Sequence, residues 1–361
     1  GYLHGQLFST YQIALRESIN NTIYFKCLLI TISIITISIT PRTLQRSVQS
    51  GSISLHDIRK NNQIIVYVGL ILVAVALIFG YERHEFDRYV SNAKPIYEYT
   101  ALGLMMIWYY SKNNTISTIL IGLVGIAYIL QGFIYGDRSS VVILAVLYIT
   151  AVGIKYSMRG MTLIAISAVA LSSAVAVYRS FSDSGISQML RSFLNRGLLL
   201  VFSDTASASF YSGIAIVAIR EKIPERFEYL WKFIASIFLG SGFPGLEEAN
   251  ITLLAKTIYP LGGGGLYPSY FYFFGGYVGV IIGAIMLALI LRIVFTGQTP
   301  YFLFLQCYMT AMSLRWFLYT PYTLFRSSIF VFSVLFYACL IFSQISKNMK
   351  CNEPKMRGVH Q

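Results

Sequence analysis

Long apolar segments, each close to the length of a membrane-spanning helix, fill most of this chain. A helix needs about twenty predominantly apolar residues to cross the hydrocarbon core of a bilayer. The segments lie near residues 22–40, 63–80, 96–110, 115–135, 139–154, 161–178, 270–291, 300–317 and 325–344. Their length and spacing predict an all-α polytopic integral membrane protein.

Composition supports the same class, because only 12% of the residues are charged whereas a soluble domain carries about 25%. The net charge of +13 does not indicate nucleic-acid binding, since the basic residues flank the apolar segments and form no compact basic domain. The histidines are scattered without metal-ligand spacing, and the cysteines lie in apolar spans or in the basic tail. We therefore expect no metal site.

The distribution of Lys and Arg predicts the orientation. Basic residues cluster in the loops 41–62 and 155–160 and in the tail 346–361. Alternating nine spans places all three on one side, which the positive-inside rule makes cytoplasmic. The chain then divides into four parts, of which the loop 179–269 lies on the periplasmic side. These parts are the N-terminal helices 1–178, a large periplasmic loop 179–269, the C-terminal helices 270–345 and a basic cytoplasmic tail 346–361.

The loop 179–269 is not uniformly polar. Residues 197–219 are apolar enough to re-enter the membrane or to cross it, and residues 229–240 could form a second crossing that leaves the orientation of the other spans unchanged. The expected fold is thus about 9–11 transmembrane helices with a large, partly membrane-embedded periplasmic loop.

Several arginines fall on the predicted outer side, against the usual bias toward cytoplasmic positive charge. The guanidinium presents a planar fork of donors that suits phosphate and carboxylate groups. Purely structural roles stay open beside this one: Arg138 could contact Asp137 to cap a tight turn, and Arg315 and Arg326 could snorkel to the interface. The candidate anion-binding arginines are Arg138, Arg179, Arg191, Arg196, Arg315 and Arg326.

Asp204 is the candidate catalytic carboxylate. It lies between Ser203 and Thr205 inside the apolar stretch 197–219, where partial burial would raise the pKa of its carboxyl group. The alternative is that Asp204 caps a short helix.

A glycine run precedes the return of the chain to the membrane at residues 262–265. Gly264 and Gly265 could let backbone N–H groups approach a ligand. Tyr267, Tyr270 and Tyr272 follow, and they could stack on sugar rings or belong to an aromatic belt at the membrane interface. The later glycines of this segment, Gly275, Gly276 and Gly279, indicate close helix packing rather than substrate contact.

Three features together resemble the Wzy-type O-antigen polymerases, or oligosaccharide repeat unit polymerases. One is the Gly-x-Arg-Ser element at residues 136–139, and another is a large outer loop in the second half of the chain. The third is Pro268-Ser269 followed by Tyr272, Phe274, Gly275 or Gly276, and Gly279. The resemblance covers about residues 60–345. Family members often place a carboxylate just before the tyrosine of the last element, whereas this chain has Ser269, Tyr270 and Phe271 there.

The resemblance implies a metal-independent membrane glycosyltransferase of the GT-C type in the bacterial inner membrane, without a cofactor. Such an enzyme polymerises undecaprenyl-pyrophosphate-linked oligosaccharide units at the periplasmic face, and a chain-length regulator protein is a further expected partner. We expect Arg138, Arg191 and Asp204 to be catalytic. The other candidates named above would bind substrate: Arg179, Arg196, Arg315, Arg326, Tyr267, Tyr270, Tyr272, Gly264 and Gly265.

Two other functions remain open. A flippase or transporter of lipid-linked oligosaccharide would also bind pyrophosphate through basic residues, although transporters usually show two similar halves, which this chain lacks. An O-antigen ligase would be expected to place a functional histidine outside, and His84 is the candidate in the loops that we place there.

Overall fold

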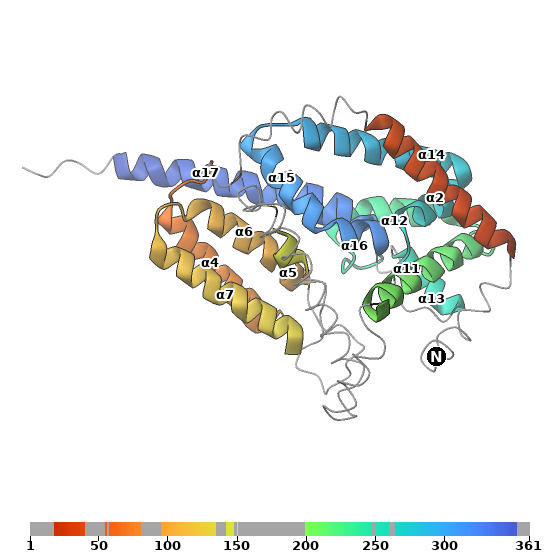
Figure 1. Ribbon diagram of the computed structural model, residues 1–361, viewed down its shortest axis with the longest axis horizontal. Coiled ribbons are helices and arrows are strands. Elements are labelled where there is room, and N and C mark those ends of the chain that lie inside the picture. The colour runs from red at the N-terminus through yellow and green to blue at the C-terminus, as the bar shows by residue number, and fades with distance from the viewer. Residues whose placement is uncertain are drawn as a thin grey trace, which may run out of the picture.

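A computed structural model of the chain describes residues 18–39, 55, 58–80, 95–134, 142–147, 150, 199–246, 250–259 and 264–351. Within these ranges the regular structure is helical (Figure 1). The helices are α2 (Ser18–Ser38), α4 (Gln63–Phe79), α5 (Pro95–Glu98), α6 (Thr100–Tyr110), α7 (Thr115–Ile134), α11 (Leu199–Ile219), α12 (Arg226–Leu239), α13 (Ile251–Ile258), α14 (Tyr267–Thr296), α15 (Pro300–Ala311), α16 (Ser313–Leu318), the π-helix η3 (Leu324–Val331) and α17 (Phe332–Cys351).

Four described helical segments are long and apolar enough to cross a membrane. They are Asn21–Ser38, Thr115–Gly132, Tyr267–Thr296 and Leu324–Ser346. The prediction of an all-helical chain with long apolar helices is therefore confirmed for the described residues.

Other predicted spans differ from the structure. The segment 63–80 forms α4, which has 17 residues, and the segment 300–317 is broken at Met312 between α15 and α16. The predicted span 161–178 and most of 139–154 lie outside the described residues.

The largest core joins α4, α6 and α7 to the C-terminal helices α15 and α17. Aromatic rings fill it, with Phe304, Phe332 and Phe336 packed against one another. At its edge Arg59 reaches from the segment before α4 to the end of α6, where its Nη2 donates to the Ser111 hydroxyl at 2.7 Å and its guanidinium lies over the Trp108 ring. These contacts order the turn between α6 and α7.

The described residues 199–246 and 250–259, which fall within the predicted loop 179–269, form helices with a core of their own. Side chains of α11, α12 and α13 surround the first turns of α14, and Ile216, Phe233, Ile251 and Phe273 lie at the centre. The prediction of two apolar helical stretches at 197–219 and 229–240 matches α11 and α12. Along the long axis of the molecule, α4, α6 and α7 lie towards one end, while α2, α11, α13 and α14 gather towards the other (Figure 1).

The helix α14 is two helices joined at a sharp reversal. Gly276 has φ +60° and ψ −147°, outside the helical region, and it divides the segment into residues 267–275 and 277–296. The two arms lie against each other, because the Tyr267 hydroxyl donates to the Gly283 carbonyl oxygen at 2.9 Å and the Phe271 ring packs on Gly283. The second arm still has about the twenty residues that a crossing requires.

Gly279 makes the tight packing of this hairpin possible. A Cβ atom placed there would lie 2.2 Å from the Phe271 carbonyl oxygen. This oxygen is a backbone atom, so it cannot move aside as the end of a flexible side chain could. The interpretation as a helix-packing glycine is therefore confirmed for Gly279. It is wrong for Gly275, where a Cβ atom would meet nothing within 4 Å, and Gly276 instead forms the reversal beside Arg220. The same helix also packs along α2, where Tyr24, Tyr272 and Val280 share a small core.

Candidate functional site

The residues of greatest chemical interest lie at the two ends of the first arm of α14, which are the glycine turn before it and the reversal after it. We call this group the hairpin site. It comprises Ser209, Arg220, Thr252, Gly264, Gly265, Tyr270, Tyr272 and Gly276.

The glycine turn brings the backbone close to two neighbouring segments. Gly264 has φ +80°, a left-handed conformation that favours glycine, and a Cβ atom there would lie 2.8 Å from the Ser209 hydroxyl and 3.0 Å from the Leu318 carbonyl oxygen. The Gly265 N–H donates to the same Leu318 carbonyl at 3.0 Å. Both glycines are thus used for close backbone approach within the protein, and their approach to a ligand stays a prediction.

Tyr270 and Thr252 hold this turn from one side. The Thr252 hydroxyl donates to the Gly264 carbonyl oxygen at 2.9 Å and is hydrogen-bonded to the Tyr270 hydroxyl, which lies 3.2 Å from the Tyr319 carbonyl oxygen. Tyr270 is 0% exposed and Tyr267 is 1% exposed. Both rings therefore support the fold where they lie, and their part in substrate binding stays a prediction.

Arg220 lies at the reversal of α14. It follows the last residue of α11, its guanidinium carbon is 5.3 Å from the centre of the Tyr272 ring, and its Nη2 lies 3.3 Å from the position of a Cβ atom on Gly276. Tyr272 is one of the predicted sugar-binding tyrosines. Its side chain is 9% exposed, and the Arg220 guanidinium lies over its ring. A larger residue than glycine at 276 would displace the guanidinium.

Two buried polar atoms of the hairpin site have no hydrogen-bond partner among the described residues. They are the Nε of Arg220 and the hydroxyl of Ser209. Unsatisfied buried donors are rare in proteins, and a bound ligand is one way to satisfy them. An arginine donor without an acceptor, stacked on a tyrosine beside a glycine reversal, has the chemistry of a subsite for an anion.

Arg220 is a candidate that the sequence alone does not select, because nothing in its residue type or neighbours distinguishes it from the other arginines of the segment 179–269. Its position directly after the apolar stretch 197–219 is the available signal. A charged residue that ends such a stretch lies where a buried helix meets polar surroundings.

Arg326 has defined partners within the protein. Its Nη1 donates to the carbonyl oxygens of Ser236 and Ile237 at 3.1 and 3.0 Å, at the C-terminal end of α12. The Tyr322 hydroxyl donates to the Ser236 carbonyl as well, at 3.1 Å. Burial raises the pKa of Tyr322, while the nearby Arg326 lowers it in part, so the phenol stays protonated near neutral pH. These contacts cap α12, and a substrate contact of Arg326 stays a prediction.

Of the remaining candidates, Arg315 alone has a described side chain. Arg315 lies half-buried in the last turn of α16. Asp204 falls within α11, in the part of that helix where the structure describes no side chains. The other four arginine candidates lie outside the described residues: Arg138, Arg179, Arg191 and Arg196.

Comparison with known proteins gives no relative from which a function could be transferred. No protein-family model, no curated protein and no solved structure matches the chain.

Proposed function

We propose that the protein polymerises undecaprenyl-pyrophosphate-linked oligosaccharide units into a surface polysaccharide at the periplasmic face of the bacterial inner membrane. The observation that carries the proposal is the unpaired Nε of Arg220, stacked on Tyr272 at the reversal of α14. Four helices that could cross a membrane supply the setting that a lipid-linked substrate needs. The resemblance to Wzy-type polymerases supplies the reaction.

In the proposed reaction, a hydroxyl oxygen of the acceptor sugar bonds to the anomeric carbon of the growing chain. The bond from that carbon to the lipid pyrophosphate breaks, and the pyrophosphate leaves with the electron pair. The acceptor hydroxyl loses its proton to a base or to water. Asp204, the carboxylate selected from the sequence, lies 16 residues before Arg220 along α11, about 24 Å away, so these two residues do not serve the same reaction centre. Positioned arginine donors stabilise the negative charge that develops on the leaving group, so the step needs no metal ion.

Arg220 would act in this reaction as an anion-binding residue. Its guanidinium lies over the Tyr272 ring and next to Gly276, and such contacts reduce the side-chain freedom that would be lost when a phosphate binds. Arg138 would join it from the turn between two earlier segments.

The direct test is extension of a lipid-pyrophosphate-linked repeat unit by the purified protein, with chain length read on a gel. We expect Arg220→Ala to lose long chains and Arg220→Lys to retain only short ones, because lysine keeps the charge but not the planar fork. Arg292→Ala is the control, since Arg292 is an exposed arginine towards the far end of α14 and away from the reversal.

Unchanged chain ladders from Arg220→Ala would remove Arg220 from the mechanism. A native protein that extends no chain but moves the lipid-linked unit across vesicle membranes would instead favour the transporter.

A further inference from the structure

The helix α12 carries a hydrophobic face that no described part of the protein covers. Phe227, Trp231, Ile234 and Phe238 are 82%, 68%, 40% and 58% exposed. Their spacing of four, three and four residues places them within about 60° of arc on the helix surface. The buried residues Phe233 and Ser236 lie on the opposite side, against the core.

This arrangement does not suit a helix that faces water, which would be polar opposite its core. The charged residues instead flank the exposed stripe, as in the ion pair between Lys232 Nζ and Glu228 Oε1 at 2.9 Å. Phe and Trp on one face with charges beside it are typical of helices that lie in a membrane interface. With 14 residues, α12 is about 21 Å long and too short to cross the hydrocarbon core.

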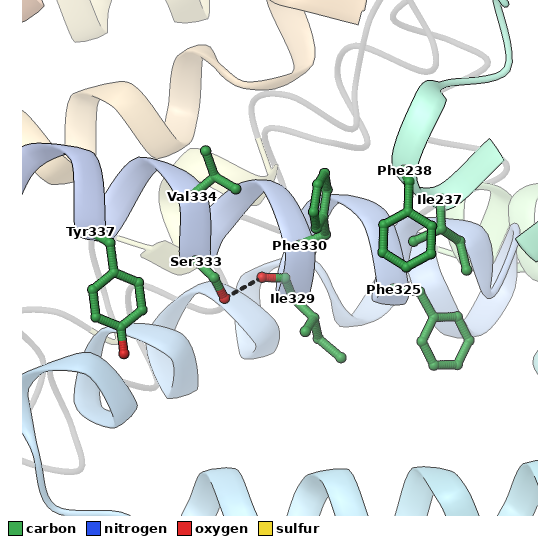
Figure 2. Close-up of a pocket in the computed structure, with 8 residues that line it drawn as sticks. All are labelled: Ile237, Phe238, Phe325, Ile329, Phe330, Ser333, Val334 and Tyr337. Atoms are coloured by element: carbon green, nitrogen blue, oxygen red, sulfur yellow. Dashed lines mark hydrogen bonds between the residues drawn. The ribbon is translucent and has the colours of Figure 1, made fainter. Parts of the chain in front are cut away.

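An apolar groove continues from this stripe (Figure 2). It has a volume of about 590 Å³ and is lined by the end of α12 together with η3 and the first turns of α17. The residues that line it are Ile237, Phe238, Phe325, Ile329, Phe330, Ser333, Val334 and Tyr337. Phe238 belongs to both surfaces, and its ring packs edge-to-face on Phe330 at 5.3 Å.

The groove offers its occupant almost no hydrogen-bonding partner. The Ser333 hydroxyl already donates to the Ile329 carbonyl oxygen (Figure 2). It also pairs with the Tyr301 hydroxyl at 2.7 Å. The occupant must therefore be apolar over its length. Several lining residues belong to Leu324–Ser346, one of the segments that could cross a membrane, so a lipid chain can enter without leaving the bilayer.

We propose that α12 lies in the membrane interface with its Phe227–Trp231–Ile234–Phe238 stripe among phospholipids, and that the groove holds one acyl chain of such a phospholipid. The bonds from Arg326 to the Ser236 and Ile237 carbonyls fix the end of α12 to η3 and so keep the groove open. This inference stands whether or not the protein is a polymerase.

Tryptophan fluorescence tests the position of α12, because the chain has three tryptophans and Trp231 is 68% exposed whereas Trp316 is 7% exposed. The full chain is reconstituted in phosphatidylcholine vesicles whose acyl chains carry bromine, a quencher, at different depths. The difference between the native chain and Trp231→Phe isolates Trp231. We expect its emission to be lost most strongly with bromine near the head of the chain.

Three results would overturn the position of α12. Quenching by aqueous acrylamide but not by bromine would show that the stripe faces water. Strongest quenching by bromine at the chain end would place α12 deep in the bilayer. Emission that resists both quenchers, and becomes sensitive when the protein is diluted into more lipid, would show that a second copy of the chain covers the stripe.

A second experiment tests the groove by introducing a tryptophan among the residues that line it. Val334→Trp is added to the Trp231→Phe chain, and we expect brominated phospholipid to quench the new emission. Absence of quenching would show that the groove holds no phospholipid chain. Recovery of the emission on addition of a small amount of undecaprenyl phosphate would show that an isoprenoid chain is the preferred occupant, which would also overturn the proposal.

Discussion

The Tyr267 hydroxyl donates a hydrogen bond to the Gly283 carbonyl oxygen at 2.9 Å, although the two residues are 16 positions apart in what is nominally one helix. In a straight helix that separation would span about 24 Å. The bond therefore requires the reversal at Gly276, and it links the two arms of α14 into a hairpin whose turn adjoins Arg220.

Replacing Gly276 with alanine should destabilise the hairpin. Its φ and ψ lie in a region that is essentially restricted to glycine, so a side chain there costs about 1–3 kcal/mol, and the new Cβ would also press on the Arg220 guanidinium. We expect a lower midpoint of thermal unfolding in detergent. Gly275→Ala is the matched control, since its Cβ would meet nothing within 4 Å. Equal effects of the two substitutions would contradict the hairpin geometry.

Thr252→Val should loosen the glycine turn. Valine keeps the shape of threonine but removes the hydroxyl that serves the Gly264 carbonyl and the Tyr270 hydroxyl. The Gly264 carbonyl then loses this donor, while the Tyr270 hydroxyl keeps the Tyr319 carbonyl oxygen as its partner. The expected loss in the free energy of unfolding is about 1–3 kcal/mol. Thr257→Val, at an exposed position on the same helix, is the control. A Thr252 variant as stable as this control would show that the network contributes nothing.

Arg326→Ala should free the C-terminal end of α12. Two carbonyl oxygens lose a charged donor, and hydrogen bonds of this kind contribute about 1.5–3 kcal/mol each. Hydrogen exchange should then become faster for the amide groups near Ser236 and Gly240 while α15 is unaffected. If exchange rises equally in α15, the variant has lost its global fold and the cap is not the cause.

The Tyr322 bond should weaken at alkaline pH. Burial raises the pKa of Tyr322 above its ordinary value of 10.0, so the folded protein favours the protonated phenol. The stabilising contribution is complete below pH 10.0 and is lost as the pH rises through the higher folded pKa. The midpoints of thermal unfolding of the native chain and of Tyr322→Phe should therefore converge at high pH. A constant difference between them would refute this dependence.

Arg138→Ala should abolish long-chain polysaccharide while the protein remains in the membrane. This prediction comes from the sequence, where the residue lies in a turn between two apolar segments, and it concerns a part of the chain outside the described residues. Polysaccharide length is measured on a gel alongside the amount of protein in the membrane fraction. Normal ladders at normal protein levels would rule out the role.

The sequence was most informative where local pattern determines structure. The boundaries of α2, α7 and the Leu324–Ser346 segment lie close to the predicted spans, because an uninterrupted apolar run between polar residues specifies a long helix whatever surrounds it. The packing role of Gly279 was equally accessible, since small residues in an apolar helix allow close approach of another backbone.

The reversal at Gly276 was not accessible in the same way. It lies inside a continuous apolar run, so no change in hydropathy marks it, and the packing of Phe271 on Gly283 that accompanies it joins residues 12 positions apart. The significance of Arg220 depends on Tyr272 and Gly276, to which only the folded chain brings it.

The hairpin has a consequence for mapping the topology of this chain. Tyr267 lies beside Gly283, which is about 10 Å along the second arm from the reversal. The glycine turn that precedes Tyr267 therefore lies alongside the second arm and not beyond the end of one long helix. A reporter fused on either side of residues 267–296 records only whether the number of crossings is odd or even. Such a reporter would register one crossing of the membrane. It would not detect the first arm, which folds back along the second arm and positions Gly264 beside Ser209.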